Sequence, residues 1–253
     1  MLCPGLAPAI QYPPGQKEQK KKVFEQEMIV ELVQGLPPFG AFDICLLPHL
    51  ENHLPFDRKN FSHKTRYTFR LEKQVSAETT FQEFSSSLRS QIRKAEKLVT
   101  ISKSEDVQLL FKMSTCTFTR QGKKNPFSLR YLKQIYEACA QNNCGKILVA
   151  SDQNKQVHAA IYIVWDTHCV YYLLGGGDEH FRSSGSYSLL LWKGIQWALK
   201  QNATFDFCGS MLPQVERFFR GFGGLQVPYF QITKFSPALK ILLPVWKTLK
   251  GSI

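Results

Sequence analysis

The apolar positions of the chain change their spacing several times, which predicts a mixture of helices and strands. In residues 77–98 apolar side chains recur every three or four positions, as they do on one face of an α-helix. The same spacing predicts further helices at 24–36, 106–120, 129–141 and 212–220. Runs rich in β-branched and aromatic residues predict strands at 41–47, 66–71, 99–101, 146–150, 159–165, 169–174, 205–207 and 227–232.

One further helix is predicted at 184–200, and it is apolar on almost all sides. Its few polar positions form one narrow stripe. A helix of this kind is buried on most of its surface, so we expect it at the centre of the fold. Either Ser184 or Ser186 can cap its first turn, and the glycines at 175–177 are expected to end the strand before it.

The order of these elements indicates an α+β fold: strand, helices, a run of hairpin strands, a buried helix, strand, helix and strand. We expect a central, mostly antiparallel sheet flanked by helices, because short turns join the strands between 146 and 174. Residues 1–60 hold too few elements to enclose a core, so they must pack on a main domain at 61–235. Residues 236–253 predict an amphipathic tail that packs on that domain rather than binding a membrane, since Pro244 interrupts it.

The composition narrows the class of protein. A formal net charge of +12 favours polyanionic partners such as nucleic acid or phosphorylated cofactors, although a solvated basic surface gives the same total. No apolar run approaches the ~20 residues of a membrane-spanning helix, and the N-terminal residues lack a signal-peptide pattern. We therefore expect a cytoplasmic protein without stable membrane insertion. The seven cysteines form no CxxC pair, and no histidine stands at metal-ligand spacing from any of them. This pattern predicts reduced thiols and no metal site.

A motif near the C-terminus carries the clearest resemblance to a known family. The segment 205–234 reads FDFCGSMLPQVERFFRGFGGLQVPYFQITK, with Asp206 on a strand, a small pair at 209–210, a helix ending in FRGFG, and Tyr229 on the next strand. This order resembles the end of the acyltransferase domain in the FemABX-like branch of the GNAT superfamily. The earlier sequence LRSQIRKAEK resembles the same family. Arg220 stands where the family has lysine, which keeps the charge and changes its geometry.

The resemblance implies a GNAT fold in which residues 1–60 are a partial N-terminal GNAT-like half. It implies an N-acyltransferase that moves an acyl group from acyl-CoA, acetyl-CoA first, to an amine acceptor. A second implied activity is an aminoacyl-tRNA-dependent transfer onto a peptidoglycan precursor of the cell wall, with tRNA as a partner. The alternative from another class of protein is a degenerate, non-catalytic GNAT module that binds RNA or an anionic glycan.

The resemblance also implies where the donor binds. In a GNAT domain the pyrophosphate of acyl-CoA lies on the N-terminus of the helix after the fourth strand, where free N–H groups and the helix dipole favour an anion. The segment FRSSGSYSLL supplies the arginine and the first glycine of the family pattern, but places a bulky tyrosine where the family has glycine or alanine. The residues assigned to donor binding in this way are Asp178, Arg182, Ser184, Gly185, Ser186 and Tyr187.

Acyl transfer to an amine requires removal of the amine proton and stabilisation of an oxyanion. The resemblance gives four catalytic candidates: Asp206, Glu216, Arg220 and Tyr229. The carboxylates are candidates for the base, Arg220 for neutralising charge, and Tyr229 for relaying a proton. Each carboxylate has a structural alternative, because Asp206 could cap a strand end and Glu216 could pair with Arg220 on the helix surface.

Three other residues with reactive side chains lie in the same half of the chain. His158 and His180 have no serine or cysteine partner in the pattern of a catalytic triad, so we interpret them as structural or exposed. Cys208 follows a short strand and is interpreted as a small buried apolar residue rather than a nucleophile.

Overall fold

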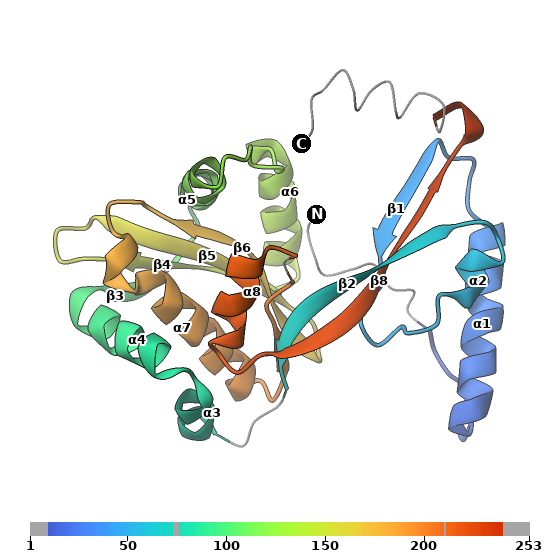
Figure 1. Cartoon of the computed structure of the whole chain (residues 1–253), viewed down its shortest axis with the longest axis horizontal. Coiled ribbons are helices and arrows are strands. Elements are labelled where there is room, and N and C mark those ends of the chain that lie inside the picture. The colour runs from blue at the N-terminus through green and yellow to red at the C-terminus, as the bar shows by residue number, and fades with distance from the viewer. Residues whose placement is uncertain (1–9, 73–75, 210, 240–253) are drawn as a thin grey trace. The chain divides into compact units, whose positions relative to one another are not determined.

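The computed structural model describes residues 10–72, 76–209 and 211–239, which form two compact units (Figure 1). Residues 68–227 belong to the first unit, and residues 10–67 together with 228–239 belong to the second. The division falls inside two long strands, whereas the sequence suggested boundaries near residues 60 and 235. The amphipathic tail predicted at 236–253 lies outside the described residues from 240 onward.

The first unit is built on the mostly antiparallel sheet that the sequence predicted. Its strands, in order across the sheet, are β2 (Ser62–Leu71), β7 (Thr204–Asp206), β6 (Cys169–Gly177), β5 (Val157–Trp165), β4 (Gly145–Ser151) and β3 (Thr100–Ser104). The strand pairs run antiparallel, except that β6 and β7 run parallel. This exception matters for the site, because the two strands part at one end.

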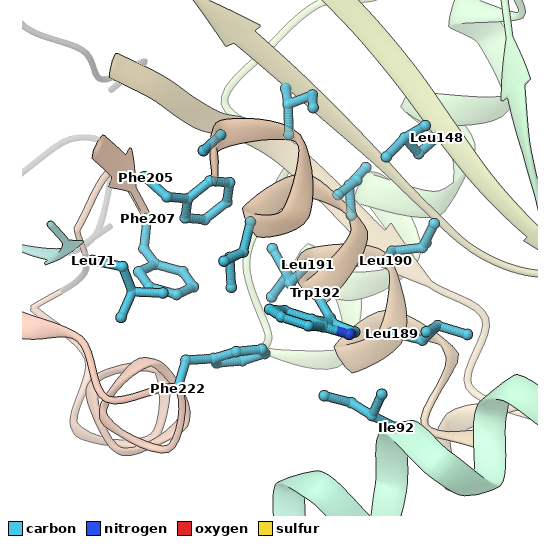
Figure 2. Packing of buried hydrophobic residues seen from close by; sticks show 14 of the residues in the cluster. Leu71, Ile92, Leu148, Leu189, Leu190, Leu191, Trp192, Phe205, Phe207 and Phe222 are labelled. Carbon is cyan, nitrogen blue, oxygen red and sulfur yellow. The ribbon is translucent and has the colours of Figure 1, made fainter. Parts of the chain in front are cut away.

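Helices cover both faces of this sheet. They are α3 (Ala77–Glu83), α4 (Ser86–Leu98), α5 (Val107–Arg120), α6 (Leu129–Gln141), the short 3₁₀ helix η1 (Arg182–Ser184), α7 (Ser186–Lys200) and α8 (Pro213–Arg220). In Figure 1, α4 and α7 lie on one side of the sheet and α5 and α6 on the other. As its apolar surface predicted, α7 is central: Figure 2 shows Trp192 of this helix toward Phe222 and Leu190 on the side of Leu148, all of them buried in the core.

The helix predicted across 77–98 is in fact two helices. The chain becomes extended at Phe84, with φ −64° and ψ 147°, and α4 starts two residues later. The side chain of Phe84 is buried in the core, and the N–H of Ser85 donates a hydrogen bond to the carbonyl of Gly221 at 2.8 Å. The hydrogen bond from Ser85 to Gly221, which is distant in sequence, therefore replaces one within a helix. The spacing of apolar residues in 77–98 does not reveal such a contact.

The sequence predicted that the strand at 169–174 stops before the glycines at 175–177. In the structure β6 continues through these glycines to Gly177. A Cβ atom on Gly176 would lie 2.0 Å from the carbonyl oxygen of Met113 in α5. The absence of a side chain therefore lets α5 pack directly against the strand. The prediction was wrong because glycine inside a strand can also mark a close approach of another backbone.

The second unit has a small core of its own. It contains α1 (Glu18–Gln34), β1 (Ala41–Cys45), α2 (Leu54–Asp57), the start of β2 and most of β8 (Leu225–Phe235). Strand β1 pairs antiparallel with β8, from Ala41 opposite Phe235 to Cys45 opposite Gln231. The buried residues of this core are Ile29, Leu46, Leu50, Phe56, Phe61 and Ile232. Residues near the two ends of the sequence thus share one core.

Candidate active site

A cavity of about 930 Å³ lies in the first unit where two parallel strands part. Strands β6 and β7 are paired only as far as Tyr171 and Asp206. Beyond this point β6 continues to Gly177, whereas the chain leaves β7 through Phe207 and Cys208. Residues of both segments line the cavity, so it occupies the space between the diverging strands.

The wall formed by β6 contains a β-bulge. The register between β5 and β6 shifts by one residue, and Leu173 has no partner in β5. Consecutive side chains of a regular strand point to opposite faces, but here Tyr172, Leu173 and Leu174 all line the cavity. The extra residue of a bulge is left out of the hydrogen-bond ladder, so its peptide group is available to a ligand.

The N-terminus of α7 contributes to the lining. The sequence predicted Ser184 or Ser186 as the N-cap of this helix. The N-cap is instead Gly185, whose backbone is left-handed at φ +74°. Glycine is required for a second reason, because a Cβ atom would lie 2.5 Å from the carbonyl oxygen of Gln91 in α4. The N–H of Ser186 donates to the hydroxyl of Ser184 at 3.2 Å. The following N–H groups of the first turn have no carbonyl acceptor within the helix and can bind an anion.

Positive charge exceeds negative charge on the lining. Arg120 at the end of α5 and Arg182 in η1 both line the cavity, against the carboxylate of Asp178. Asp178 accepts a hydrogen bond from the N–H of His180 at 2.9 Å. The N-terminus of α7 adds the positive end of its dipole to the two guanidinium groups. The cavity therefore favours an anionic ligand.

Tyr187, which departs from the family pattern, makes a hydrogen bond through its hydroxyl to the hydroxyl of Tyr172 on β6. Its ring also stacks on Phe218 of α8, with 6.0 Å between centroids. Burial raises the pKa of Tyr187 to about 12 and, with the neighbouring tyrosine, holds the pKa of Tyr172 well above its ordinary value. Both side chains line the cavity and are protonated at neutral pH, so each can donate a proton. Tyr172 was missed because the bulge beside it leaves no mark in the sequence.

His158, interpreted from the sequence as structural or exposed, lies in the cavity wall and is 6% exposed. Its ring stacks on Phe181, with 3.9 Å between centroids and 6° between planes. Within the described residues neither ring nitrogen makes a hydrogen bond. Nε2 lies 3.5 Å from Oδ2 of Asp152, which is an electrostatic contact longer than a good hydrogen bond. Nδ1 is buried and unpaired, which makes it a candidate proton acceptor for a substrate that reaches the cavity wall.

The family follows from a direct comparison. A family model described as "Acetyltransferase (GNAT) domain" matches residues 82–220, a range that contains the whole cavity lining. The chain belongs to the GNAT acetyltransferase family. The family suggested by the motif at 205–234 is thereby confirmed.

Solved structures agree with this GNAT fold. FemX matches with a TM-score of 0.67 at 13% identity, over 84% of this chain and 77% of that chain. L-PGS from Bacillus licheniformis matches with a TM-score of 0.54 at 13% identity, over 87% of this chain and 76% of that chain. At these identities the likeness concerns the fold. No curated protein sequence matches the chain.

The residues that the resemblance assigned to donor binding come together in the GNAT domain. Those that line the cavity are Asp178, Arg182, Gly185, Ser186 and Tyr187. Ser184 is buried beside them, and its hydroxyl donates to the hydroxyl of Ser186 at 2.9 Å. Their role in binding a donor stays a prediction, but their shared position at the start of α7 agrees with it.

Asp206 does not line the cavity and is held by partners of its own. It is 1% exposed, and its Oδ2 accepts a hydrogen bond from Nε of Arg70 at 2.7 Å. Its Oδ1 accepts from the hydroxyl of Thr68 and, at 2.7 Å, from the N–H of Cys208. Asp206 thus fixes the turn that carries Cys208 to the cavity, which matches its structural alternative as a strand-end cap.

The other catalytic candidates also lie outside the lining. Glu216 and Arg220 form the predicted pair on α8, with 2.9 Å between Oε1 and Nε, and Arg220 also donates to Gln226 at 2.8 Å. Both members of the pair are solvent-accessible, and α8 lines the cavity with other side chains. Tyr229 lies on β8 in the second unit. The catalytic roles of these residues stay predictions, and His158 is a further candidate proton acceptor because it lies in the lining.

Two further expectations concern the described residues as a set. None of their helices is long and apolar enough to cross a membrane. Cys116, Cys139, Cys144 and Cys169 are free thiols.

Proposed function

We propose that the first unit is an N-acyltransferase that takes its acyl group from acyl-CoA, acetyl-CoA first, and passes it to an amine. Membership of the GNAT family supports acyl transfer as the reaction. The observation that carries the choice of donor is the cavity between β6 and β7, which extends to the start of α7. Its volume of about 930 Å³ is within the range of cofactor-sized sites.

The two ends of the donor find complementary groups on this lining. The pyrophosphate is expected at the first turn of α7, where backbone N–H groups point outward and Arg182 supplies positive charge. Arg120 adds a second guanidinium. The thioester is expected beside the bulge in β6, where the N–H of Leu173, a residue without a partner in β5, can donate to the carbonyl oxygen as it becomes an oxyanion.

Proton transfer can be assigned to cavity residues. The amine nitrogen attacks the thioester carbon, the new N–C bond forms, and the C–S bond breaks. We assign the proton lost by the amine to Nδ1 of His158, whose Nε2 faces Asp152. The leaving thiolate takes its proton from the pair formed by Tyr172 and Tyr187, since both hydroxyls are protonated at neutral pH.

The same cavity could serve a different donor. The FemABX-like resemblance of residues 205–234 and the net charge of +12 favour aminoacyl-tRNA as the second candidate, with a peptidoglycan precursor as acceptor. An aminoacyl ester and a thioester undergo the same attack by an amine, so the assignment of His158 applies to both. Only binding experiments with each donor separate the two proposals.

The first test measures thermal stabilisation by acetyl-CoA, longer acyl-CoAs and deacylated tRNA, each added separately. A ligand that binds only the folded state at a hundredfold excess over its Kd raises Tm by roughly 5–10 °C. Arg182→Ala is expected to weaken acetyl-CoA binding roughly 10-fold, because it removes a charge-assisted contact. Arg217→Ala is the matched control, since Arg217 is exposed on α8 and outside the lining. A shift with tRNA alone would favour the second donor, and no shift with any ligand would reject both.

The second test concerns His158. Thiol release from acetyl-CoA is measured with a panel of amines, comparing His158→Gln with His168→Gln, an exposed residue outside the cavity. Loss of a general base is expected to lower kcat by roughly 10²–10⁴-fold. The Tm shift with acetyl-CoA should be unchanged in His158→Gln, which separates loss of chemistry from loss of binding. Equal kcat values for the two variants would rule out His158 as the base.

A further inference from the structure

The second unit contains a group of three side chains that have the composition of a metal site. His53, Asp57 and His63 each offer a ligand atom, and these atoms lie within 4.8 Å of one another. Nδ1 of His63 is 2.9 Å from Oδ1 of Asp57, and Nε2 of His53 is 3.5 Å from Oδ2 of the same carboxylate. The sequence predicted no metal site, because that prediction rested only on histidines spaced from cysteines. This group contains two histidines and an aspartate and no cysteine.

The local backbone holds the three side chains in place. His53 is the N-cap of α2 and Asp57 is its last residue, so the two are four positions apart on one helical turn. The chain then reverses through Asn60, whose backbone is left-handed at φ +60°, and enters β2, where His63 is the second residue. The N–H of Phe61 closes this reversal on the carbonyl of Phe56 at 3.1 Å.

Buried aromatic rings anchor the chain on both sides of the group. Phe56 and Phe61 are 5% and 6% exposed and pack edge-on, with 5.7 Å between centroids. Phe230 of β8 packs against both imidazoles, at 4.2 Å from His53 and 6.0 Å from His63. The two imidazoles and the carboxylate are therefore placed before any ligand arrives, which lowers the entropic cost of binding.

We propose that His53, Asp57 and His63 bind a divalent transition-metal ion, with zinc as the occupant that the ligand types favour. Two imidazoles and one carboxylate are a common ligand set for zinc. Bonds of about 2.0–2.1 Å in a tetrahedron place neighbouring ligand atoms about 3.4 Å apart. The imidazole nitrogens lie 2.9 and 3.5 Å from the two oxygens of Asp57, and the three ligand atoms lie within 4.8 Å of one another. Three protein ligands leave one position for water or for a group from a substrate. The proposal concerns the second unit and is independent of acyl transfer.

A hydrogen-bonded cluster without metal is the competing explanation, and it fits one histidine only. The 2.9 Å contact of His63 with Asp57 is a good hydrogen bond, but the 3.5 Å contact of His53 is too long for one. A metal ion at Nε2 would replace this weak contact by a coordinate bond.

The test is a calorimetric titration of the chelator-treated full chain with Zn²⁺, followed by Co²⁺ substitution. One equivalent of Zn²⁺ is expected per chain, and bound Co²⁺ should show the intense visible absorption of a four-coordinate site. His63→Gln is expected to weaken Zn²⁺ binding at least about 100-fold, because loss of an outer-shell partner alone costs 10–100-fold. His63 is exposed, so this variant should keep its fold, and circular dichroism checks that it does.

The control variant is His168→Gln, which removes an exposed histidine of the first unit. It should bind Zn²⁺ as the unaltered chain does. Asp57→Asn tests the carboxylate separately and should weaken binding while keeping the side-chain shape. Absence of saturable Zn²⁺ binding, or equal affinity in His63→Gln and His168→Gln, would overturn the proposal. Neither result would affect the thermal shift with acetyl-CoA, so the two proposals fail separately.

Discussion

At the scale of single residues, the hydrogen-bonded tyrosines of the cavity give the protein a defined response to alkaline pH. The pKa of Tyr187 is raised to about 12 and that of Tyr172 is raised further, whereas unfolded tyrosines ionise near 10.0. Above pH 10 the unfolded chain therefore loses these protons first. The folded state then binds more protons than the unfolded state, so the free energy of unfolding falls as pH rises.

For Tyr187 alone the expected fall is about 2 kcal/mol between pH 10 and 12. It is measured by urea denaturation at a series of pH values. In the double variant Tyr172→Phe with Tyr187→Phe the fall should be smaller, because two of the ionising groups are gone. Tyr131→Phe removes an exposed hydroxyl and should leave the fall unchanged. An identical pH profile for the double variant would show that these tyrosines are not shifted.

Residues differ in how far the sequence reveals their place. Arg182 and Gly185 stand in a known motif, so the sequence alone predicts their neighbourhood at the start of α7. His158 belongs to no motif, and only the pairing of strands and the stacking of Phe181 bring it to the cavity. Asp206 stands in the motif at 205–234, yet the ion pair with Arg70 depends on a residue far away in the chain.

At the scale of elements, the packing of α4 against the start of α7 depends on Gly185. Gly185→Ala introduces a Cβ at φ +74° and 2.5 Å from the carbonyl oxygen of Gln91. Gly122→Ala is the matched control, because Gly122 has φ +68° and nothing within 4 Å of its Cβ. The control is expected to lose about 1 kcal/mol of unfolding free energy through backbone strain. Gly185→Ala should lose about 2–4 kcal/mol, because overpacking adds to that strain.

Equilibrium denaturation of the two variants measures this difference. Acetyl-CoA affinity should also fall in Gly185→Ala, since the N–H groups of the first turn of α7 would shift, and should be unchanged in Gly122→Ala. Equal losses of unfolding free energy in the two variants would show that α4 can move away from position 185 at no cost in stability. In that case the close packing of the two helices would not be what fixes the start of α7.

The elements themselves were largely predictable, and the errors share one cause. Periodicity located α7 and the strands β4, β5 and β6, because burial of one face or all faces leaves a regular pattern. The break at Phe84 and the continuation of β6 through Gly176 were missed. Both depend on backbone contacts with distant segments, at Gly221 and Met113, which impose no local period.

At the scale of the whole molecule, the sequence suggested boundaries near residues 60 and 235, whereas the division into two units falls inside β2 and β8. β2 and β8 each run unbroken through the division, with no glycine-rich or charged linker at residues 67 and 228. The composition does not change there either. The large core around α7 and the small core around Ile29 can be told apart only from their contacts.

These two cores are expected to differ in local stability. The larger core contains six buried residues of α7 and three of β5, whereas α1 buries only Ile29 among its described residues. Local opening is easier where few apolar contacts hold an element. Amide hydrogen exchange followed by mass spectrometry should therefore show the slowest exchange in α7 and β5, and markedly faster exchange in α1 and β1. Acetyl-CoA should slow exchange further at the start of α7 and along β6, and leave α1 unchanged. Exchange in α1 as slow as in β5 would mean that the small core is as stable as the large one.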